Sequence, residues 1–157
     1  MSVSAPTRTS TALTDTHLAI SVGPDLRFLA RLEAGAAPLT CAAFLSLLPF
    51  RSRLVQARWS GEAGWIPLGD LSLNVPFEHH TSYPSPGQIL FYPGGYSETE
   101  ILVPYGATAF SSKLGTLAGN HFLTIVEGVD LLPELGRRLL WEGALDVLFE
   151  KGARDGA

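Results

Sequence analysis

Short apolar segments separated by turns dominate the stretch from Thr81 to Glu127. It reads TSYPSPGQILFYPGGYSETEILVPYGATAFSSKLGTLAGNHFLTIVE, in which three strand-like runs alternate with loops rich in Gly, Ser, Tyr, His and Glu. Segments this short, bounded by glycine and proline, favour a β-sheet over long helices. Because loops at strand ends carry many binding and catalytic side chains, the same stretch is where a functional site is expected.

Alternation of apolar and polar residues extends this pattern to both ends of the chain. It predicts strands at 17–22, 26–32, 52–59, 61–69, 88–92, 100–103, 122–127 and 144–150, with a long loop up to residue 86. Helices are predicted over 36–50 and 131–141, the second with Asp130 as its N-cap and Pro133 in its first turn. Eight strands are enough to close a barrel. The sequence therefore predicts a mainly β fold, a closed antiparallel β-barrel of about eight strands with two helices at its open ends.

Length, charge and composition narrow the class of protein. The chain has 157 residues, a net charge of -4, 46% hydrophobic residues and 17% charged residues. This suits one globular domain, placed at 17–151 between a disordered N-terminal tail (1–16) and a short C-terminal tail (152–157). No cluster of Lys and Arg offers a surface for nucleic acid, and no run of about 20 apolar residues could cross a bilayer. We expect a cytoplasmic protein with a small-molecule ligand, and a homodimer is one option.

The lone cysteine, Cys41, lies in the apolar segment LTCAAFLSLL. It can form no internal disulfide, and we expect it to be a small buried residue rather than a nucleophile.

Two carboxylates stand two residues apart after a Pro-Gly-Gly turn. If the following strand includes both Glu98 and Glu100, they share one face at a spacing of about 6–7 Å. Such a pair suits acid–base chemistry, a cation or an amine, whereas the simpler alternative is a solvated strand end. The preceding glycines favour a site, because they let a ligand or another loop approach the backbone closely.

Histidines supply the other titratable candidates. Asn120 and His121 open an apolar strand, and His121 with Glu98 or Glu100 would form the best available general base. His79 and His80 are adjacent, so only one of them is expected to line the site; His80 is the candidate, and the sequence leaves open which of the two faces the site. No two histidines stand at i, i+2 on a strand or at i, i+4 on a helix. We therefore predict no metal and no cofactor.

Aromatic residues crowd the same loops and complete the predicted site. Several tyrosines near one rim would suit an amphipathic small ligand, because each combines an apolar ring with a polar end. The sequence thus predicts one pocket at a barrel mouth, lined by Trp65, His80, Tyr83, Tyr92, Glu98, Glu100, Asn120 and His121. Ser111-Ser112-Lys113 is the remaining polar cluster, but it lacks the companion motifs of a Ser-Lys nucleophile or a phosphate loop.

Three motifs carry a family resemblance: GEAGWIPLG at 61–69, TSYPSPGQILFYPGGYSETEILVPYG at 81–106 and SSKLGTLAGNHFLTIVEG at 111–128. With the LWEGALDVLFE ending, they make the chain resemble a bacterial domain family of unknown function that has a cyclophilin-like barrel. His79-His80 departs from the Glu-Asn pair that is usual in that family. Proteins with this barrel also form parts of biotin-dependent and ATP-dependent amide-processing enzymes, so the resemblance implies an amide or amino-acid-like ligand.

Two functions stay open on the sequence. The first is a small-molecule binding or accessory module. The second is an enzyme, either a hydrolase or isomerase using His121 with Glu98 or Glu100, or a peptidyl-prolyl isomerase. The last is disfavoured, since SRLVQARW supplies Arg53 and Arg58 but not the Phe-His-Arg-type motif of cyclophilins. The rival fold is a cupin: GQILFYPGGYSE fits half of its pattern, with Glu98 in place of a metal-binding His, but the HxH…E half is absent.

Overall fold

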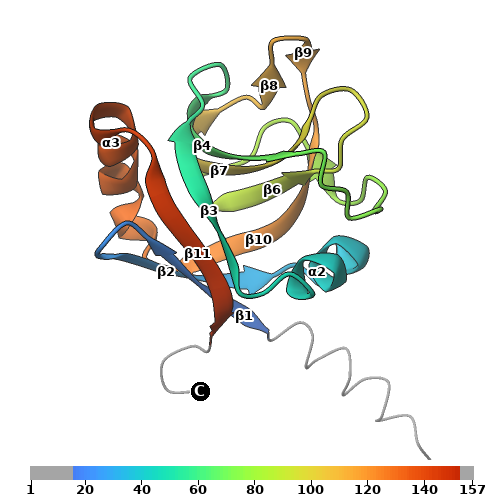
Figure 1. Ribbon diagram of the computed structural model, residues 1–157, viewed down its shortest axis with the longest axis horizontal. Helices are drawn as coiled ribbons and strands as arrows, with labels where there is room; N and C mark the ends of the chain where they lie inside the picture. Colours follow the sequence, from blue (N-terminus) through green and yellow to red (C-terminus); the bar gives the residue numbers. More distant parts are fainter. Residues whose placement is uncertain (1–15, 153–157) are drawn as a thin grey trace, which may run out of the picture.

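Eight antiparallel strands close into a barrel in the computed structural model, which describes residues 16–152 (Figure 1). Around the barrel the order is β2-β1-β11-β3-β4-β7-β6-β10, and pairing of β10 with β2 closes the ring. The strands are β1 (His17–Val22), β2 (Leu26–Leu32), β3 (Phe50–Gln56), β4 (Gly61–Gly69), β6 (Gln88–Tyr92), β7 (Thr99–Thr108), β10 (Gly119–Glu127) and β11 (Leu145–Gly152). The predicted fold class is confirmed.

Three further strands were not predicted. β5 (His80–Thr81) pairs with the start of β10, while β8 (Ser111–Ser112) and β9 (Gly115–Thr116) form a separate two-stranded ribbon. Each has only two residues, which is too short for alternation to show. The β8–β9 ribbon stands above β4 and β7 in Figure 1.

Side chains of the strands divide between two apolar clusters. On β6, Ile89 and Phe91 belong to the large cluster that fills the barrel, whereas Leu90 and Tyr92 belong to a second, smaller cluster. Because successive strand residues point to opposite faces, the second cluster lies on the outside of the barrel. Phe110 and Leu117, which flank the β8–β9 ribbon, cover it. The sheet is therefore apolar on both faces in this region, and the ribbon shields the outer one.

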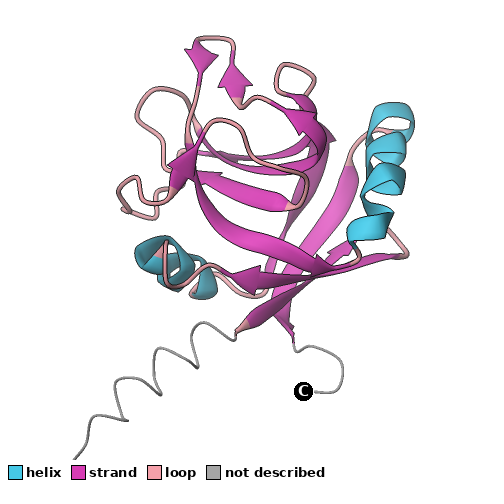
Figure 2. Cartoon of the chain, turned by 180° about the vertical axis from the view of Figure 1, so that it is seen from behind, coloured by secondary structure: helices cyan, strands magenta, loops and turns pink. Residues whose placement is uncertain are grey.

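Two α-helices lie on opposite sides of the barrel (Figure 2). α2 (Pro38–Leu45) buries Phe44 against three rings of the core. α3 (Leu132–Glu142) buries Leu132, Leu135 and Leu139, which lie at helical spacing on one face. Both add to the apolar filling of the barrel.

The predicted helix boundaries needed correction. The first helix is shorter than the predicted 36–50, because Phe50 already pairs with β11. Asp130 is not the N-cap of the second helix: it lies in a 3-10 turn, η1 (Val129–Leu131), and the N-cap is Leu131.

Strand ends also differ from the prediction where neighbouring strands extend the pairing. β7 continues past residue 103 because β4 pairs with it as far as Thr108. β3 ends at Gln56, which places Trp59 in the turn before β4 rather than on a strand. The predicted tails lie outside the described residues, except for Thr16 and for Gly152, which ends β11. Within residues 16–152, no helix has the length and apolar character needed to span a bilayer.

Candidate functional site

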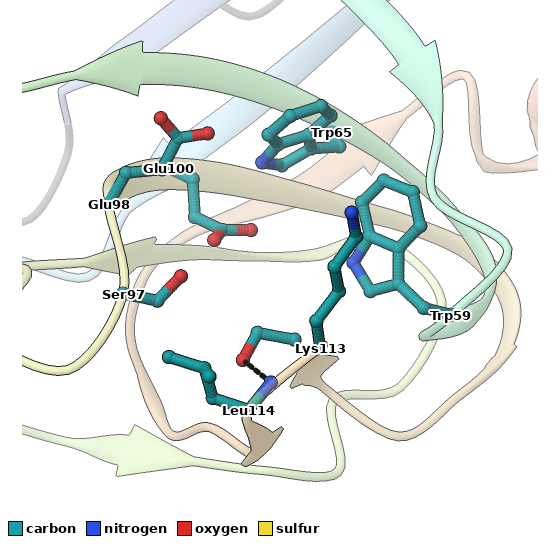
Figure 3. Close-up of a pocket in the computed structure, with 8 residues that line it drawn as sticks. Trp59, Trp65, Ser97, Glu98, Glu100, Lys113 and Leu114 are labelled. Atoms are coloured by element: carbon teal, nitrogen blue, oxygen red, sulfur yellow. Dashed lines mark hydrogen bonds between the residues drawn. The ribbon is translucent and has the colours of Figure 1, made fainter.

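A pocket of about 400 Å³ lies on the outer face of the barrel, between β4 and β7 on one side and the β8–β9 ribbon on the other (Figure 3). Trp65 on β4 pairs with Leu102 on β7, and Leu102 belongs to the outer cluster. The pocket therefore opens beside the barrel wall rather than at a barrel mouth, where the sequence had placed it. Its lining consists of Trp59, Trp65, Ser97, Glu98, Glu100, Ser112, Lys113 and Leu114.

Two tryptophans form the aromatic wall of the pocket. Their rings meet edge to face, with centroids 5.2 Å apart and planes inclined by 80°. Trp65 packs against the outer cluster, while Trp59, in the turn before β4, is 47% exposed. The pair thus leaves an aromatic surface open to a ligand, a geometry that suits planar groups.

Glu100 is the buried acid of the pocket. It lies on β7 opposite Tyr92 and is only 3% exposed, whereas Glu98, just before the strand, is exposed. Burial raises the pKa of Glu100 to about 7, and the nearby charge of Glu98 adds to the effect. Both residues line the pocket, and their carboxylates point away from each other in Figure 3. A carboxyl with this pKa changes protonation near neutral pH.

Two polar atoms in the pocket have no hydrogen-bond partner. Among the described residues, three buried side-chain nitrogen or oxygen atoms are unpaired, and two of them are Trp65 Nε1 and Glu100 Oε1. The indole lies close enough to the carboxylate to lower its pKa slightly, but no hydrogen bond of acceptable geometry joins Nε1 to Oε1. Buried polar groups are usually paired, so this donor and this acceptor indicate a place for a ligand or water.

Tyr92 supports the pocket from below instead of lining it. The side chain is 2% exposed, and its hydroxyl oxygen accepts hydrogen bonds from the backbone N–H of Tyr96 (3.0 Å) and of Ser97 (3.1 Å). Tyr96 in turn donates its hydroxyl to the Leu114 carbonyl at 2.8 Å. These bonds fix the loop that carries Glu98 and tie it to the ribbon.

The ribbon supplies the cation of the pocket. Ser112 Oγ accepts the Leu114 N–H at 3.0 Å, which closes the turn between β8 and β9. From this turn the Lys113 side chain extends toward the tryptophans (Figure 3). Among the ion pairs of the described residues, none joins Lys113 to Glu98 or Glu100.

His121 belongs to a different cluster, here called the His121 network, which comprises Glu33, His79, His121 and Thr124. His121 Nε2 lies 2.7 Å from Thr124 Oγ1, and that hydroxyl donates to Glu33 Oε2. Because Thr124 donates to the carboxylate, the His121 Nε2–H must be the donor in the first bond. Burial lowers the pKa of His121, although the Glu33 charge opposes this. A neutral His121 with its Nε2 proton engaged fits a structural residue.

The strand order explains why His121 and the carboxylates are apart. Leu90 on β6 pairs with Leu102 on β7 on one side and with His121 on β10 on the other. β7 and β10 are therefore two strand spacings apart, about 9–10 Å. The predicted general base of His121 with Glu98 or Glu100 is not assembled in this structure.

Asn120 is a structural clamp. It is fully buried; its Nδ2 donates to Thr40 Oγ1 (3.0 Å) and to the Pro76 carbonyl (2.9 Å), and its Oδ1 accepts the Glu78 N–H (3.1 Å). Glu78 also accepts hydrogen bonds from the backbone and hydroxyl of Thr40, in the first turn of α2. Asn120 thus joins the long loop to the helix and does not line the pocket.

The remaining predicted site residues also lie outside the pocket lining. His79 stacks on His121 with ring centroids 4.9 Å apart, and the ring of the exposed His80 lies beside Phe77. Tyr83 is 72% exposed. Of the eight predicted residues, the pocket gathers Trp65, Glu98 and Glu100.

Sequence reasoning missed Trp59, Ser97 and Leu114, and it set Ser112 and Lys113 aside for lack of a motif. No local pattern marks the first three as site residues, because they reach the pocket only through the packing of turns.

The sequence also made predictions about metal ligands and about the cysteine. The described residues contain no group of three His, Cys, Asp or Glu side chains that could hold a metal ion. That no metal or cofactor is required stays a prediction. Cys41 is buried, its Sγ donates to the Phe122 carbonyl, and burial raises the pKa of the thiol to about 12. At neutral pH it is an unreactive thiol.

Comparison with known proteins places the chain in a wider group. A family described as protein of unknown function (DUF3830) matches residues 18–150. No curated protein matches the sequence. The structure of McbB in complex with tryptophan is similar, with a TM-score of 0.64 and 22% identity. The match covers 89% of this chain but 45% of the McbB chain, so this chain spans less than half of McbB. The solution structure of the hypothetical protein AF2241 from Archaeoglobus fulgidus is also similar, with a TM-score of 0.60 and 18% identity. The match covers 88% of this chain and 96% of that one. Identities this low show a shared fold only.

Proposed function

We propose that this chain, which belongs to the DUF3830 family of proteins of unknown function, is a small-molecule binding module for an amide or amino-acid-like ligand. The observation that carries the proposal is the composition of the outer pocket. One cavity of about 400 Å³ combines an aromatic wall, two acidic side chains and one lysine. Ligand pockets are typically apolar with a few polar groups that fix orientation, and this lining fits a molecule with an apolar body and polar ends.

The fold comparison is compatible with such a ligand but does not identify it. Tryptophan, the molecule bound to McbB in the similar structure, is an amino acid with an aromatic body. At 22% identity the shared barrel carries no residue roles across, so this is an analogy of fold alone. That the protein acts in the cytoplasm, alone or as a homodimer, remains a prediction.

Acid–base catalysis by Glu100 is the second candidate function. The observation that favours it is a carboxyl whose pKa is raised to about 7 inside a pocket. Such a group can give and take a proton near neutral pH, as a general acid or base must. In this version a hydrolase or isomerase would use Glu100 without His121, because His121 lies in its own network.

Indole N–H signals of the three tryptophans test the proposal by NMR. Protein labelled with nitrogen-15 is titrated with the amino acids and with their N-acetyl amides. We expect at least one of these compounds to shift the Trp59 and Trp65 signals. The signal of Trp141, which is 80% exposed on α3, should not change. If the whole panel leaves Trp59 and Trp65 unmoved, the binding proposal is wrong. Turnover of a bound compound that stops in Glu100→Gln would favour the enzyme.

A further inference from the structure

The two unpaired atoms of the pocket specify a ligand more closely than its overall composition does. Trp65 Nε1 can only donate a hydrogen bond, and Glu100 Oε1 can accept one. Both lie in the same lining, and both are shielded from bulk water. A ligand that pairs both atoms must offer an acceptor and a donor of its own, close to one another.

We propose that the pocket selects a neutral ligand through an amide edge, a C=O beside an N–H, with Trp65 donating to the carbonyl and Glu100 pairing with the edge. This inference rests on the proposed binding function and narrows it to one ligand class. Lactams, ureides and primary amides all carry such an edge. A simple ammonium or carboxylate does not.

Charged ligands fit the pocket less well, for two reasons. An ammonium group offers only donors, so it would leave the Trp65 N–H unpaired, and Lys113 would repel it. A carboxylate offers only acceptors, so it would leave the Glu100 acceptor unpaired, and Glu98 would repel it. Burying a charge without full pairing is costly, whereas a neutral edge with one donor and one acceptor avoids that cost.

Glu100 in its acid form completes the match. A protonated carboxyl donates its O–H to the amide carbonyl and accepts the amide N–H on its other oxygen, so that two hydrogen bonds form side by side. Burial next to Glu98 favours this acid form near neutral pH. Binding should then take up a proton when Glu100 starts ionised, and affinity should fall as the pH rises above about 7.

The aromatic wall gives the ligand a second constraint. Trp59 and Trp65 meet at 80°, so their rings form a corner with one face of Trp59 partly open. A planar amide or an aromatic amide could lie against one ring while its edge reaches the Trp65 N–H. The preferred ligand is therefore flat as well as neutral.

Three matched probes separate the ligand classes: benzamide, benzylamine and benzoate, which are neutral, cationic and anionic at neutral pH. Each is titrated into the full chain while the tryptophan indole N–H signals are followed by NMR. We expect benzamide to bind about ten-fold more tightly than either charged probe, since each charged probe leaves one buried polar group unpaired. The Trp65 Nε1–H signal should move downfield, as expected for a new hydrogen bond to a carbonyl.

Variants identify the atoms involved. Glu100→Gln keeps an acceptor and a donor at the same place, so benzamide binding should stay within about three-fold while its pH dependence disappears. Glu100→Ala and Trp65→Phe each remove one partner and should weaken binding by about ten-fold. Trp141→Phe, at the exposed tryptophan on α3 outside the pocket lining, is the matched control for Trp65→Phe and should leave benzamide binding unchanged.

The outcomes distinguish this inference from the binding function itself. If benzylamine or benzoate binds best in the pocket, the amide edge is wrong while the binding module stands. The same holds if Glu100→Gln abolishes benzamide binding or leaves its pH dependence intact. If no probe moves the Trp59 or Trp65 signal, and the amino acids and their amides also fail, neither proposal stands.

Discussion

The outer pocket and the His121 network lie on the same side of the sheet, on either side of strand β6, and each buries a titratable group. They differ in whether their buried polar atoms have hydrogen-bond partners. In the network, His121 Nε2, Thr124 Oγ1 and Glu33 Oε2 form a continuous chain of hydrogen bonds. In the pocket, Trp65 Nε1 and Glu100 Oε1 are buried with no partner. Because folding alone satisfies the first group and not the second, pairing separates structural support from a candidate site better than residue type does.

Asn120→Ala should have the largest effect, because it removes the three hydrogen bonds of a fully buried side chain on the supporting side of this comparison. Its partners on α2 and in the long loop would be left unpaired, so we expect a loss of about 2–4 kcal/mol in the free energy of unfolding. Chemical denaturation measures it. Tyr83→Ala, at an exposed position, is the control and should change stability by less than about 0.5 kcal/mol. An equally small loss at Asn120 would contradict its role as a clamp.

Glu100→Gln should stabilise the protein at high pH. The folded pKa of about 7 lies above the ordinary value of 4.5, so the folded protein binds this proton more tightly and loses stability as the pH rises from about 4.5 to about 7. Glutamine removes that loss, and we expect a gain of about 1–3 kcal/mol at pH 8 and almost none at pH 4.

Denaturation curves at the two pH values test the Glu100 prediction. Glu98→Gln, at an exposed carboxylate beside it, serves as the control and should give a much smaller change. If the free energy of unfolding of the wild-type protein does not fall between pH 5 and pH 8 relative to that of Glu100→Gln, burial does not raise the pKa of Glu100. The contrast between the pocket and the His121 network would then have no basis.

Thr124→Val breaks the His121 network while keeping the shape of the side chain. It leaves the His121 Nε2–H and Glu33 without their shared hydroxyl, and we expect a loss of about 1–2 kcal/mol. The Trp59 and Trp65 indole signals should not move, because the network and the pocket are separate. Thr116→Val, on the exposed β9 strand, is the matched control. Movement of the Trp65 signal in Thr124→Val would show that the two regions are coupled.

Tyr96→Phe should have the smallest effect on stability. It removes one exposed hydrogen bond from the loop to the Leu114 carbonyl, which contributes less than about 0.5 kcal/mol at the surface. Its effect should be local: amide hydrogen exchange should become faster at Leu114, in the turn of the ribbon, and at Leu117, just after it. Unchanged exchange there would mean that Tyr96 does not hold the ribbon over the pocket.

Much of the fold could be predicted because its determinants are local. Alternation at 26–32 predicts a strand with one inward face, and Leu26, Phe28, Ala30 and Leu32 are buried in the barrel, since successive strand residues point to opposite faces whatever the strands pair with. The prediction that Glu98 and Glu100 belong to one site also rested on nearby residues; β7 begins at Thr99, so Glu98 lies just before the strand, and both line the pocket. Boundaries were less well predicted, because pairing with a neighbour can extend or shorten a strand, as at β3 and β7.

The sequence by itself determined a closed β-barrel with an acidic pair and Trp65 close to one another. Only the tertiary structure decided that the pocket lies on the outer wall, that Trp59 and Lys113 complete it, and that His121 does not. The reason is strand order: β6 lies between β7 and β10, so Glu100 and His121 are two strands apart in space. Which strands become neighbours depends on long-range pairing over the whole barrel, and no local pattern of residues encodes it.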